Sequence, residues 1–460
     1  TQVKQPDGAI TTTAYGNWMT TTTNPRGLVT DRSYDAYRQL VRVAERIVAP
    51  VTTTTCVRSS CTTTTTLQTV STYTTNVSYD LLGRRVAIVD ARGNVTTSTY
   101  DPLGRRSQAS DPDLGTWQYG YDDAGHVTSQ TDARGVVIAT SYDALGRPLV
   151  RSDGSTTLAA FSYDEVGAGA ANIGRLTSFV DPTGSTRRDY DAGGRVVAEI
   201  KTIGDDTYQI DWGFDVAGRV TSIRYPHVGG VREQVLQSYD GSGRVIAVGE
   251  YVAGAAYDAR GNLTAATYGN GATVARSYSP TRGWMMGQTV TAGGQVRDQF
   301  AVTRSLAGDI TARTSSTAAR DAWTFAYDPL GRLTGADNTV DNALDEAFTY
   351  DALGDRLTAV RGAVTTAYQY PTVGAPRPHA PTTIAGVPVR YDANGNRLGI
   401  GLAVDAIYDA SNRLVDDGTV TYAYDAEGTR VRAGSKVFVR DLIEVDGACS
   451  TRFYYLGQER

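Results

Sequence analysis

The alternation of apolar and polar residues along this chain predicts short β-strands through most of its length. Residues 194–200, with the sequence GRVVAEI, alternate in this way and are rich in β-branched side chains, as strands are. The second residue after a recurring glycine is apolar in many places: Val127, Val196, Val220, Val245, Leu263 and Leu333. We expect this position to face a packed surface, because alternate residues of a strand share one face of the sheet.

The predicted strands are separated by a turn sequence that recurs with a fixed period. The segments YDLLGR, YDPLGR, YDDAGH and YDALGR begin at residues 79, 100, 121 and 142, each 21 residues after the one before. A constant period in this range indicates a repeat architecture rather than one compact core.

Each repeat has room for two turns and two strands. An aspartate followed three residues later by glycine favours a type I turn, because the carboxylate accepts backbone N–H bonds within the turn. A second aspartate follows each tyrosine after eleven residues, at Asp90, Asp111, Asp132 and Asp153. The remaining residues give strands of about six or seven residues, or about 20 Å. The tyrosine closes a strand, and we expect its ring to pack on the neighbouring repeat while its hydroxyl stays near water.

The motif continues, with more variation, to the end of the chain. Further copies begin at Tyr163, Tyr190, Phe214, Tyr239, Tyr257, Tyr278, Tyr327, Tyr350, Tyr391, Tyr408 and Tyr424, and residues 34–38 carry it without glycine. We predict a structural role in the repeat for Tyr79, Asp80, Gly83, Arg84, Tyr100, Asp101, Gly104, Arg105, Tyr142, Asp143, Gly146, Arg147, Tyr327, Asp328, Gly331, Arg332, Tyr391, Asp392 and Gly395.

These motifs resemble those of a known family. Tyr-Asp-x-x-Gly-Arg at 21-residue spacing is similar to the YD repeats of bacterial RHS proteins, and of the related TcC toxin-complex subunits and teneurins. The C-terminal order RPHA (377–380), YDANGNR (391–397), YDASNRL (408–414) and YDAEGTR (424–430) resembles the RHS core pattern.

The resemblance implies an all-β protein whose hairpins spiral into a large hollow shell around a C-terminal toxic polypeptide. This chain would then be a partial wall, with divergent Thr-rich repeats at residues 1–70 and the repeat shell at 71–460. Family elements expected near the end of the core are absent from the sequence, so we expect the chain to stop before the core C-terminus and the toxin. No catalytic role is carried over to any residue.

Composition fits a thin, wetted wall and argues against nucleic-acid binding. Hydrophobic residues make up 40%, glycines number 49 and the mean hydropathy is −0.30, which suits one solvated sheet better than a dense sandwich. The 44 basic and 49 acidic residues are interspersed, so no basic face is expected. No run of eighteen apolar residues occurs, no signal peptide is visible, and the resemblance implies a secreted or cell-surface protein.

A Thr-rich block at residues 52–66 departs most from the repeat. It is nearly symmetric about residues 57–60 and predicts a hairpin with a four-residue loop, across which Cys56 and Cys61 face each other. A disulfide and two reduced thiols both remain open. Cys449 has no evident partner, and the spacing does not suit a zinc ribbon. Just before this block, apolar residues at 37–48 fit a helix or a strand, and the repeat context favours a strand.

Motifs that carry catalytic or metal chemistry are mostly missing. His126, His227 and His379 are isolated in the sequence and lack metal-ligand spacing. The aspartates occupy turn positions, and no calcium-loop pattern occurs. We therefore expect no catalytic, cofactor or metal residue, and no enzyme.

Two functional classes follow. The first is a container that sequesters a C-terminal toxin polypeptide until delivery, with secretion-apparatus or cap proteins as further partners. The alternative is an extracellular adhesion module that binds glycans or proteins through the repeat exterior. A structural filament is a third interpretation.

Overall fold

The computed structural model describes residues 1–57, 60–167, 171–227, 232–447 and 449–457. The chain forms two compact units: unit 1 comprises residues 1–116, 276–290 and 296–389, and unit 2 comprises residues 117–275, 291–295 and 390–460. The boundaries fall within β10 (Gly115–Tyr121), β24 (Thr273–Tyr278), β25 (Met285–Ala292), β26 (Gln295–Arg304) and β34 (Val387–Tyr391). The division at residue 70 that we derived from the sequence stays a prediction.

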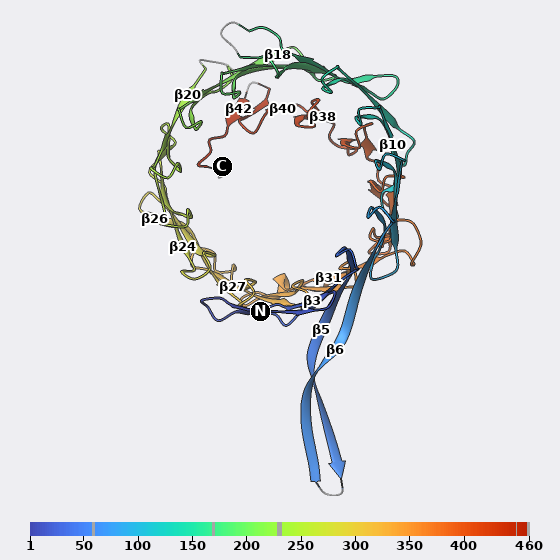
Figure 1. Ribbon diagram of the computed structural model, residues 1–460. Coiled ribbons are helices and arrows are strands. Elements are labelled where there is room, and N and C mark those ends of the chain that lie inside the picture. The colour runs from blue at the N-terminus through green and yellow to red at the C-terminus, as the bar shows by residue number, and fades with distance from the viewer. Residues whose placement is uncertain (58–59, 168–170, 228–231, 448, 458–460) are drawn as a thin grey trace. The chain divides into compact units, whose positions relative to one another are not determined.

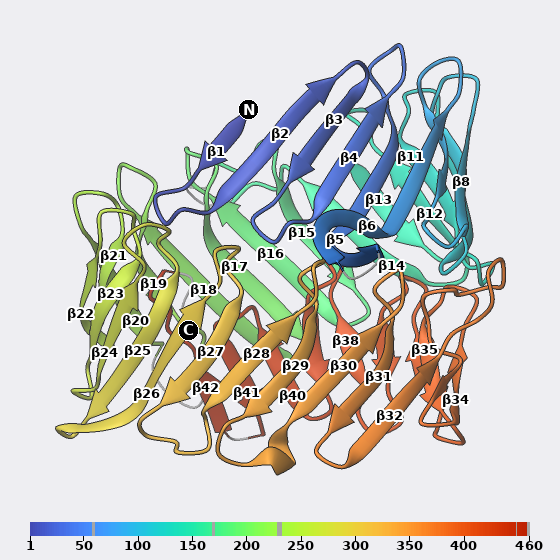
Figure 2. The same cartoon turned by 90° about the horizontal axis from the view of Figure 1, so that it is seen from below.

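Unit 1 consists of strands and one short helix, and strands that are consecutive in the chain pair antiparallel (Figure 2). Its other elements are β1 (Gln2–Lys4), β2 (Ile10–Gly16), β3 (Met19–Thr23), β4 (Val29–Tyr34), β5 (Leu40–Val57), β6 (Ser60–Tyr79), β7 (Arg85–Val89), β8 (Val95–Tyr100), β9 (Arg106–Asp111), β27 (Ile310–Ser315), β28 (Trp323–Tyr327), β29 (Leu333–Asn338), the 3-10 helix η1 (Asn342–Leu344), β30 (Glu346–Tyr350), β31 (Arg356–Arg361), β32 (Val364–Gln369) and β33 (Thr383–Ile384).

Unit 2 follows the same antiparallel order and ends in a separate five-stranded sheet. Its strands are β11 (Val127–Thr131), β12 (Val137–Tyr142), β13 (Pro148–Ser152), β14 (Thr157–Tyr163), β15 (Leu176–Asp181), β16 (Gly184–Tyr190), β17 (Val196–Ile203), β18 (Asp206–Phe214), β19 (Val220–Arg224), β20 (Gln234–Tyr239), β21 (Val245–Val248), β22 (Val252–Tyr257), β23 (Leu263–Tyr268), β35 (Arg397–Ile400), β36 (Ile407–Tyr408), β37 (Leu414–Asp416), β38 (Tyr422–Tyr424), β39 (Arg430–Ala433), β40 (Lys436–Val439), β41 (Ile443–Asp446) and β42 (Cys449–Arg452).

The period in the sequence corresponds to one hairpin per repeat, so the all-β prediction is confirmed. The strands β7 to β14 give two strands to each 21-residue repeat, and motif tyrosines end their strands: Tyr79 ends β6, Tyr100 ends β8 and Tyr142 ends β12. The apolar residue two positions after the motif glycine begins the next strand. Leu263 there is buried and Val127 is half-buried, as expected for a position on a packed face.

The segment after the first motif is a strand, as the repeat context predicted. β5 and β6 pair from Arg42 and Asn76 to Val57 and Ser60, and they form a long two-stranded hairpin that extends beyond the other strands of unit 1 (Figure 1). Pairing reaches Val57 and Ser60, so the four-residue loop predicted there is wrong. Cys56 and Cys61 lie opposite each other in register. Their side chains lie outside the described part of the structure, and the disulfide stays a prediction.

The densest core lies in unit 2, where the five-stranded sheet covers part of the repeat sheet. Strands β40 and β42 lie alongside β18 and β20 (Figure 1). Apolar side chains of β17 to β23 and of β39 to β41 form one core, in which Ile203, Ile210, Val248, Val431, Val439 and Ile443 are almost fully buried. Two layers of apolar surface are thereby removed from water. The single wetted sheet expected from composition therefore does not describe this region.

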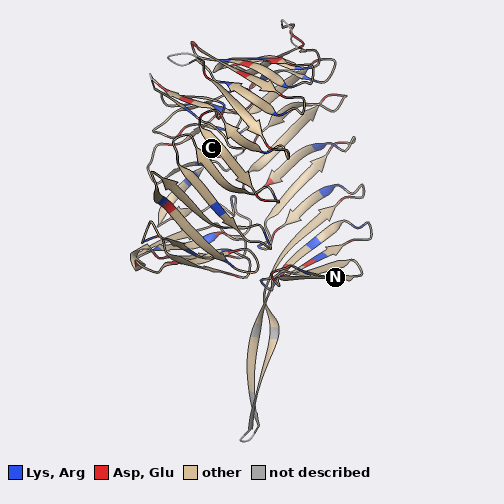
Figure 3. Cartoon of the chain, turned by 90° about the vertical axis from the view of Figure 1, so that its left-hand side faces the viewer, with Lys and Arg blue, Asp and Glu red and all other residues tan. Residues whose placement is uncertain are grey.

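Charged residues of both signs are distributed over the strands and turns of each unit (Figure 3). Arginine–aspartate pairs recur at the turns, for example Arg84 with Asp80 and Arg332 with Asp328. The interspersed charge expected from the sequence is therefore present, and it is organised by the repeat.

Candidate functional site in the repeat turns

The motif turn, which we define as the turn that follows each motif tyrosine, is held by its aspartate. Asp80 Oδ1 accepts hydrogen bonds from the backbone N–H groups of Leu82 and Arg84, both at 2.9 Å. Gly83 N–H donates to the Asp80 carbonyl at 3.0 Å, and Gly83 has a φ of 78°, which is the geometry of a type I turn followed by a glycine bulge. A residue with a side chain would be strained at that φ.

The same aspartate binds the arginine of its own turn. Arg84 Nε donates to Asp80 Oδ2 at 2.6 Å, and Arg332 Nε donates to Asp328 Oδ2 at 2.6 Å. The hydrogen bond from the Arg84 backbone N–H, with the guanidinium, holds the pKa of Asp80 below its ordinary value. This stabilisation is present above the pKa of an unfolded aspartate and is lost as the pH falls through the lower folded value.

The arginine then reaches the next repeat. The Arg332 guanidinium lies 4.9 Å from the ring centroid of Tyr350, and its Nη1 donates to the Asp351 carbonyl at 2.8 Å. Arg84 lies over the ring of Tyr100 in the same way, at 4.8 Å. The ion pair is thus within one turn, and the backbone carbonyl of the next turn receives the second bond of Arg332.

The motif tyrosine completes the connection by binding backward along the chain. Tyr350 Oη donates to the carbonyl of Leu333 at 2.8 Å, and Tyr100 Oη donates to the carbonyl of Arg85 at 2.8 Å. Each acceptor is the first residue of a strand of the preceding repeat. The hydroxyl is thus bonded to the protein backbone. Its expected place near water stays a prediction.

The residues that we singled out in the sequence occupy equivalent places in these turns. Asp101 and Asp143 bind Arg105 and Arg147 at 2.6 and 2.7 Å. Glycines at the fifth motif position have positive φ: Gly83, Gly104, Gly146, Gly331 and Gly395. Asp392 Oδ2 binds Asn396 at 2.8 Å in place of an arginine.

Other side chains replace the arginine or the glycine where the sequence drifts. His126 Nδ1 lies 2.9 Å from Asp122 Oδ2, and its ring stacks on Tyr142 with centroids 4.8 Å apart. Arg38 stands where the glycine belongs, with a φ of 63°, and the turn still closes by the bond from its N–H to Asp35. The turn geometry therefore tolerates substitution at a cost in backbone strain.

Motif turns late in the chain bind turns at the other end of early strands, which we call opposite turns. In unit 1, arginine–aspartate pairs make these contacts: Arg282–Asp7 at 2.7 Å, Arg26–Asp309 through Nε at 2.9 Å and Arg92–Asp351 at 3.0 Å. In unit 2, the buried Asn394 amide donates to Asp132 Oδ2 at 2.7 Å and accepts from Ala133 N–H at 2.9 Å.

Glu199 and Lys201 are buried charges of unit 2 that were not predicted from the sequence. Glu199 binds Arg188 and Arg440, each at 2.8 Å through Nε, and Lys201 binds Asp425. Both residues alternate with Ile203 on the buried face of β17. Charges at every second position of an otherwise apolar strand were the available signal, because a buried charge requires a partner.

His379 is also less isolated than its sequence context suggested. Its Nδ1 lies 2.5 Å from Asp113 Oδ2, and its Nε2 lies 3.4 Å from Asp90 Oδ2. No cluster of metal-ligating side chains occurs within the part of the chain that the structure describes. In the same residues, no helix is long and apolar enough to cross a membrane.

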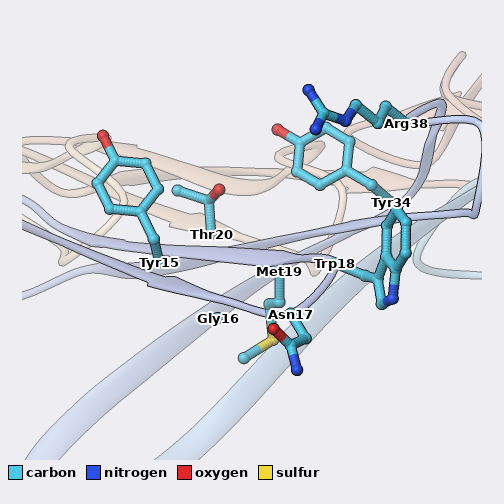
Figure 4. Close-up of a pocket in the computed structure, with 8 residues that line it drawn as sticks. All are labelled: Tyr15, Gly16, Asn17, Trp18, Met19, Thr20, Tyr34 and Arg38. Carbon is cyan, nitrogen blue, oxygen red and sulfur yellow. The ribbon is translucent and has the colours of Figure 1, made fainter.

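A surface hollow of about 740 Å³ lies at the β2–β3 turn of unit 1. Its lining residues are Tyr15, Gly16, Asn17, Trp18, Met19, Thr20, Tyr34 and Arg38. Figure 4 shows Tyr15, Thr20, Tyr34 and Arg38 on one side of the strands, and Asn17, Trp18 and Met19 on the other. Aromatic and cationic side chains of this kind can bind a ring that carries a negative charge.

Comparison with known families identifies the repeat. The RHS Repeat model matches residues 79–116 and 121–157, which contain the motif turns at Asp80, Asp101, Asp122 and Asp143. The chain contains RHS repeats. The resemblance that the motifs indicated is therefore confirmed. No curated protein matches this RHS-repeat chain.

Solved structures share the fold over nearly the whole chain. The Photorhabdus luminescens Tc holotoxin pore matches with 16% identity and a TM-score of 0.78, covering 98% of the RHS-repeat chain and 26% of the matched chain. TcdB2-TccC3 matches with 16% identity and a TM-score of 0.77, covering 98% of the RHS-repeat chain and 28% of the matched chain. TcdB2-TccC3 without its hypervariable C-terminal region matches with 16% identity and a TM-score of 0.77, covering 98% of the RHS-repeat chain and 26% of the matched chain. The RHS-repeat chain thus spans about a quarter of the length of these proteins.

Proposed function

We propose that this RHS-repeat chain is part of the wall of a shell that sequesters a C-terminal toxin polypeptide until delivery. The observation that carries the proposal is the bonding of each motif turn to the neighbouring repeats. Tyr350 binds back to Leu333, and Arg332 binds forward to Tyr350 and Asp351. Such bonding can extend a thin sheet over many repeats without a continuous core, as a wall requires.

The shared fold supports the same proposal. The matching TcdB2-TccC3 protein has a hypervariable C-terminal region, and a region of that kind is the enclosed partner we propose. Other toxin-complex components and cap proteins would complete the shell, since this chain spans about a quarter of the matched chains. We further propose that the segment is not an enzyme and that the whole protein is secreted or exposed at the cell surface.

Electron cryo-microscopy and limited proteolysis of the full protein that contains this segment test the container. We expect a closed wall with density inside it, and a C-terminal region that resists protease in the intact protein. The double variant with Tyr350→Ala and Arg332→Ala should make that region cleavable. The control variant Tyr37→Ala, at a residue that is 87% exposed, should not. A wall filled by its own side chains, or a C-terminal region cleaved at once in the parent protein, contradicts the proposal.

The hollow in Figure 4 favours glycan binding as a second candidate function. Tyr15 and Tyr34 offer ring faces on the side that carries Arg38, and this arrangement suits a saccharide bearing a carboxylate. A glycan array with sialylated, uronate-containing and neutral oligosaccharides tests it. Binding of an acidic glycan that is lost in Arg38→Ala and kept in Arg42→Ala supports this function, and failure of all three classes to bind rejects it.

A further inference from the structure

The motif turn at residues 350–355 of unit 1 carries an aspartate where most copies have arginine. Residues 350–355 have the sequence YDALGD, and the turn closes normally, with Asp351 N–H donating to the Asp355 carbonyl at 2.9 Å. Asp351 Oδ1 accepts the backbone N–H of Asp355 at 2.9 Å. Two carboxylates thus occupy the place of an ion pair. Asp355 Oδ2 is buried and has no hydrogen-bond partner among the described residues.

The missing cation is supplied by a residue far away in the sequence. Arg92, from the opposite turn between β7 and β8, lies 3.0 Å from Asp351 Oδ2 and 3.9 Å from Asp355 Oδ2. Its Nη2 donates to the carbonyl of Pro371 at 3.1 Å. Arg92 therefore joins the β30–β31 turn to the start of the loop that follows β32, here called the 371–381 loop.

His379 fastens the other end of this loop to the early strands. Both ring nitrogens face carboxylate oxygens, Nδ1 that of Asp113 at 2.5 Å and Nε2 that of Asp90 at 3.4 Å. The His379 backbone N–H donates to Asp113 Oδ1 at 3.2 Å. A neutral imidazole has one donor and one acceptor nitrogen, so only the protonated ring presents a donor to both carboxylates.

Carboxylates on the turns around the His379 imidazole favour its protonated form. Asp90 lies in the β7–β8 turn, Asp113 in the β9–β10 turn, and Asp351 with Asp355 in the β30–β31 turn. The permanent cation Arg92 lies beside Asp351 and Asp355, and Arg377 lies two residues before His379, with its backbone N–H donating to the Pro112 carbonyl at 2.7 Å. Tyr370 lies against the same group, where burial and then Asp355 and Asp351 raise its pKa to about 12, so it stays neutral.

We propose that His379 is a pH-dependent latch, which when protonated ties the 371–381 loop to Asp113 and Asp90 and when neutral lets the loop open. The opening would separate contacts between segments more than 250 residues apart, since Arg92 and Pro371 differ by 279 positions and His379 and Asp113 by 266. This inference concerns unit 1 alone and does not depend on the container.

The direction of the pH effect follows from the contacts. Burial alone would lower the pKa of His379, but the hydrogen bond to Asp113 and the charges of Asp113, Asp355 and Asp90 outweigh it and raise that pKa above its ordinary value. The stabilisation is then complete below the pKa of an unfolded histidine and is lost as the pH rises through the folded value. Burial and then the Asp351 charge raise the pKa of Asp355, which also favours the closed loop at lower pH.

The titration of the ring is the first test. Histidine-labelled chain has three imidazoles, His126, His227 and His379, so NMR can follow each one. We expect the midpoint of His379 above 6.5, and a lower midpoint in Asp113→Asn. Asp355→Arg, which restores the repeat arginine, should also lower it. A His379 midpoint at or below 6.5 in the parent chain overturns the proposal.

Hydrogen exchange tests whether the loop responds. The protection factors of the backbone amides in residues 371–381 should fall by about fivefold or more between pH 5.5 and pH 8.5. This loss of protection should disappear in His379→Gln and persist in His126→Gln. The protection of the β28–β29 turn should stay unchanged in all variants, which checks that they are folded. Equal protection at both pH values, or the same loss in His379→Gln, contradicts the latch.

Discussion

The chemistry of a motif turn is shared among three side chains, each with two partners. Aspartate binds the turn backbone and the guanidinium, arginine binds that carboxylate and the next tyrosine, and tyrosine packs under one arginine while its hydroxyl binds a strand of the preceding repeat. Each partly exposed ion pair is worth at most about 1 kcal/mol. Stability therefore comes from many equivalent bonds along the chain.

Removal of one tyrosine hydroxyl tests this sharing. Tyr350→Phe deletes the 2.8 Å bond to the Leu333 carbonyl and keeps the ring beneath Arg332, so we expect a loss of about 1 kcal/mol. Chemical denaturation and hydrogen exchange at Leu333–Asn338 measure it. Tyr37→Phe, at an exposed ring, is the control and should change stability by less than about 0.5 kcal/mol. Equal effects of the two variants would refute the assignment.

Two motif glycines separate backbone strain from crowding. At Gly125 the φ is 91° and an added Cβ would meet nothing within 4 Å, whereas at Gly331 it would lie 2.9 Å from the Arg26 guanidinium. Gly125→Ala should cost about 1–2 kcal/mol from strain alone. Gly331→Ala should cost about 1 kcal/mol more by disturbing the Arg26–Asp309 pair.

A double-mutant cycle decides the origin of that difference. In an Arg26→Ala background, Gly331→Ala should cost no more than Gly125→Ala does in the parent chain, since the contact is already absent. An undiminished extra cost would place its origin elsewhere.

Among the elements, the β5–β6 hairpin differs from the rest because it leaves its sheet. Beyond Ile47 and Ser71 the two strands pair only with each other, and an isolated two-stranded hairpin is marginally stable in water. Hydroxyl pairs such as Thr52–Thr65 and Thr54–Thr63, at 2.9 and 3.0 Å, join the strands, and these four threonines are exposed.

Deletion of this extension should leave the rest of the chain folded. Replacement of residues 49–68 by a two-residue Asn-Gly turn should change the free energy of unfolding by less than about 1 kcal/mol, measured by chemical denaturation. The matched deletion of one whole repeat, residues 79–99, should be far more damaging. A hairpin deletion that unfolds unit 1 would show that the extension carries tertiary contacts.

The strands were predictable at the level of elements because their pattern is local. The 21-residue period located the turns, and the tyrosines marked the ends of strands such as β8 and β12. The contacts of His379 with Asp113, Asn394 with Asp132 and Glu199 with Arg440 were not predictable. The partners lie more than 200 positions apart and depend on how distant repeats align. The local role of Asp80 follows from its sequence; the unusual role of Asp355 follows only from Arg92 beside it.

Across the whole molecule, such long-range contacts join distant parts of the chain within each unit. In unit 2 the most buried of these ion pairs joins Lys201 to Asp425, with side chains 6% and 2% exposed. Asp425 also accepts the backbone N–H groups of Glu427 and Thr429. The pair therefore fixes a late motif turn on an early strand.

The loss of one partner should be more harmful than the loss of both charges. Lys201→Met leaves Asp425 buried without a cation and should cost about 3–5 kcal/mol. Adding Asp425→Asn, which keeps the turn bonds, should recover more than half of that. Lys436→Met, at an exposed pair with Glu444, should cost less than about 1 kcal/mol. Thermal and denaturant unfolding of the four chains measures these values, and equal costs at Lys201 and Lys436 would disprove the ranking.

The sequence differences among motif turns have one more consequence. In a chain of identical repeats, the contacts between distant repeats could shift by one repeat without a cost in free energy. Here Asp351 and Asp355 need Arg92, while Asn394 needs Asp132, so a misaligned winding would set carboxylate beside carboxylate and leave an amide unmatched. The irregular copies thus specify which repeats contact each other, so that a chain of similar repeats folds with one alignment.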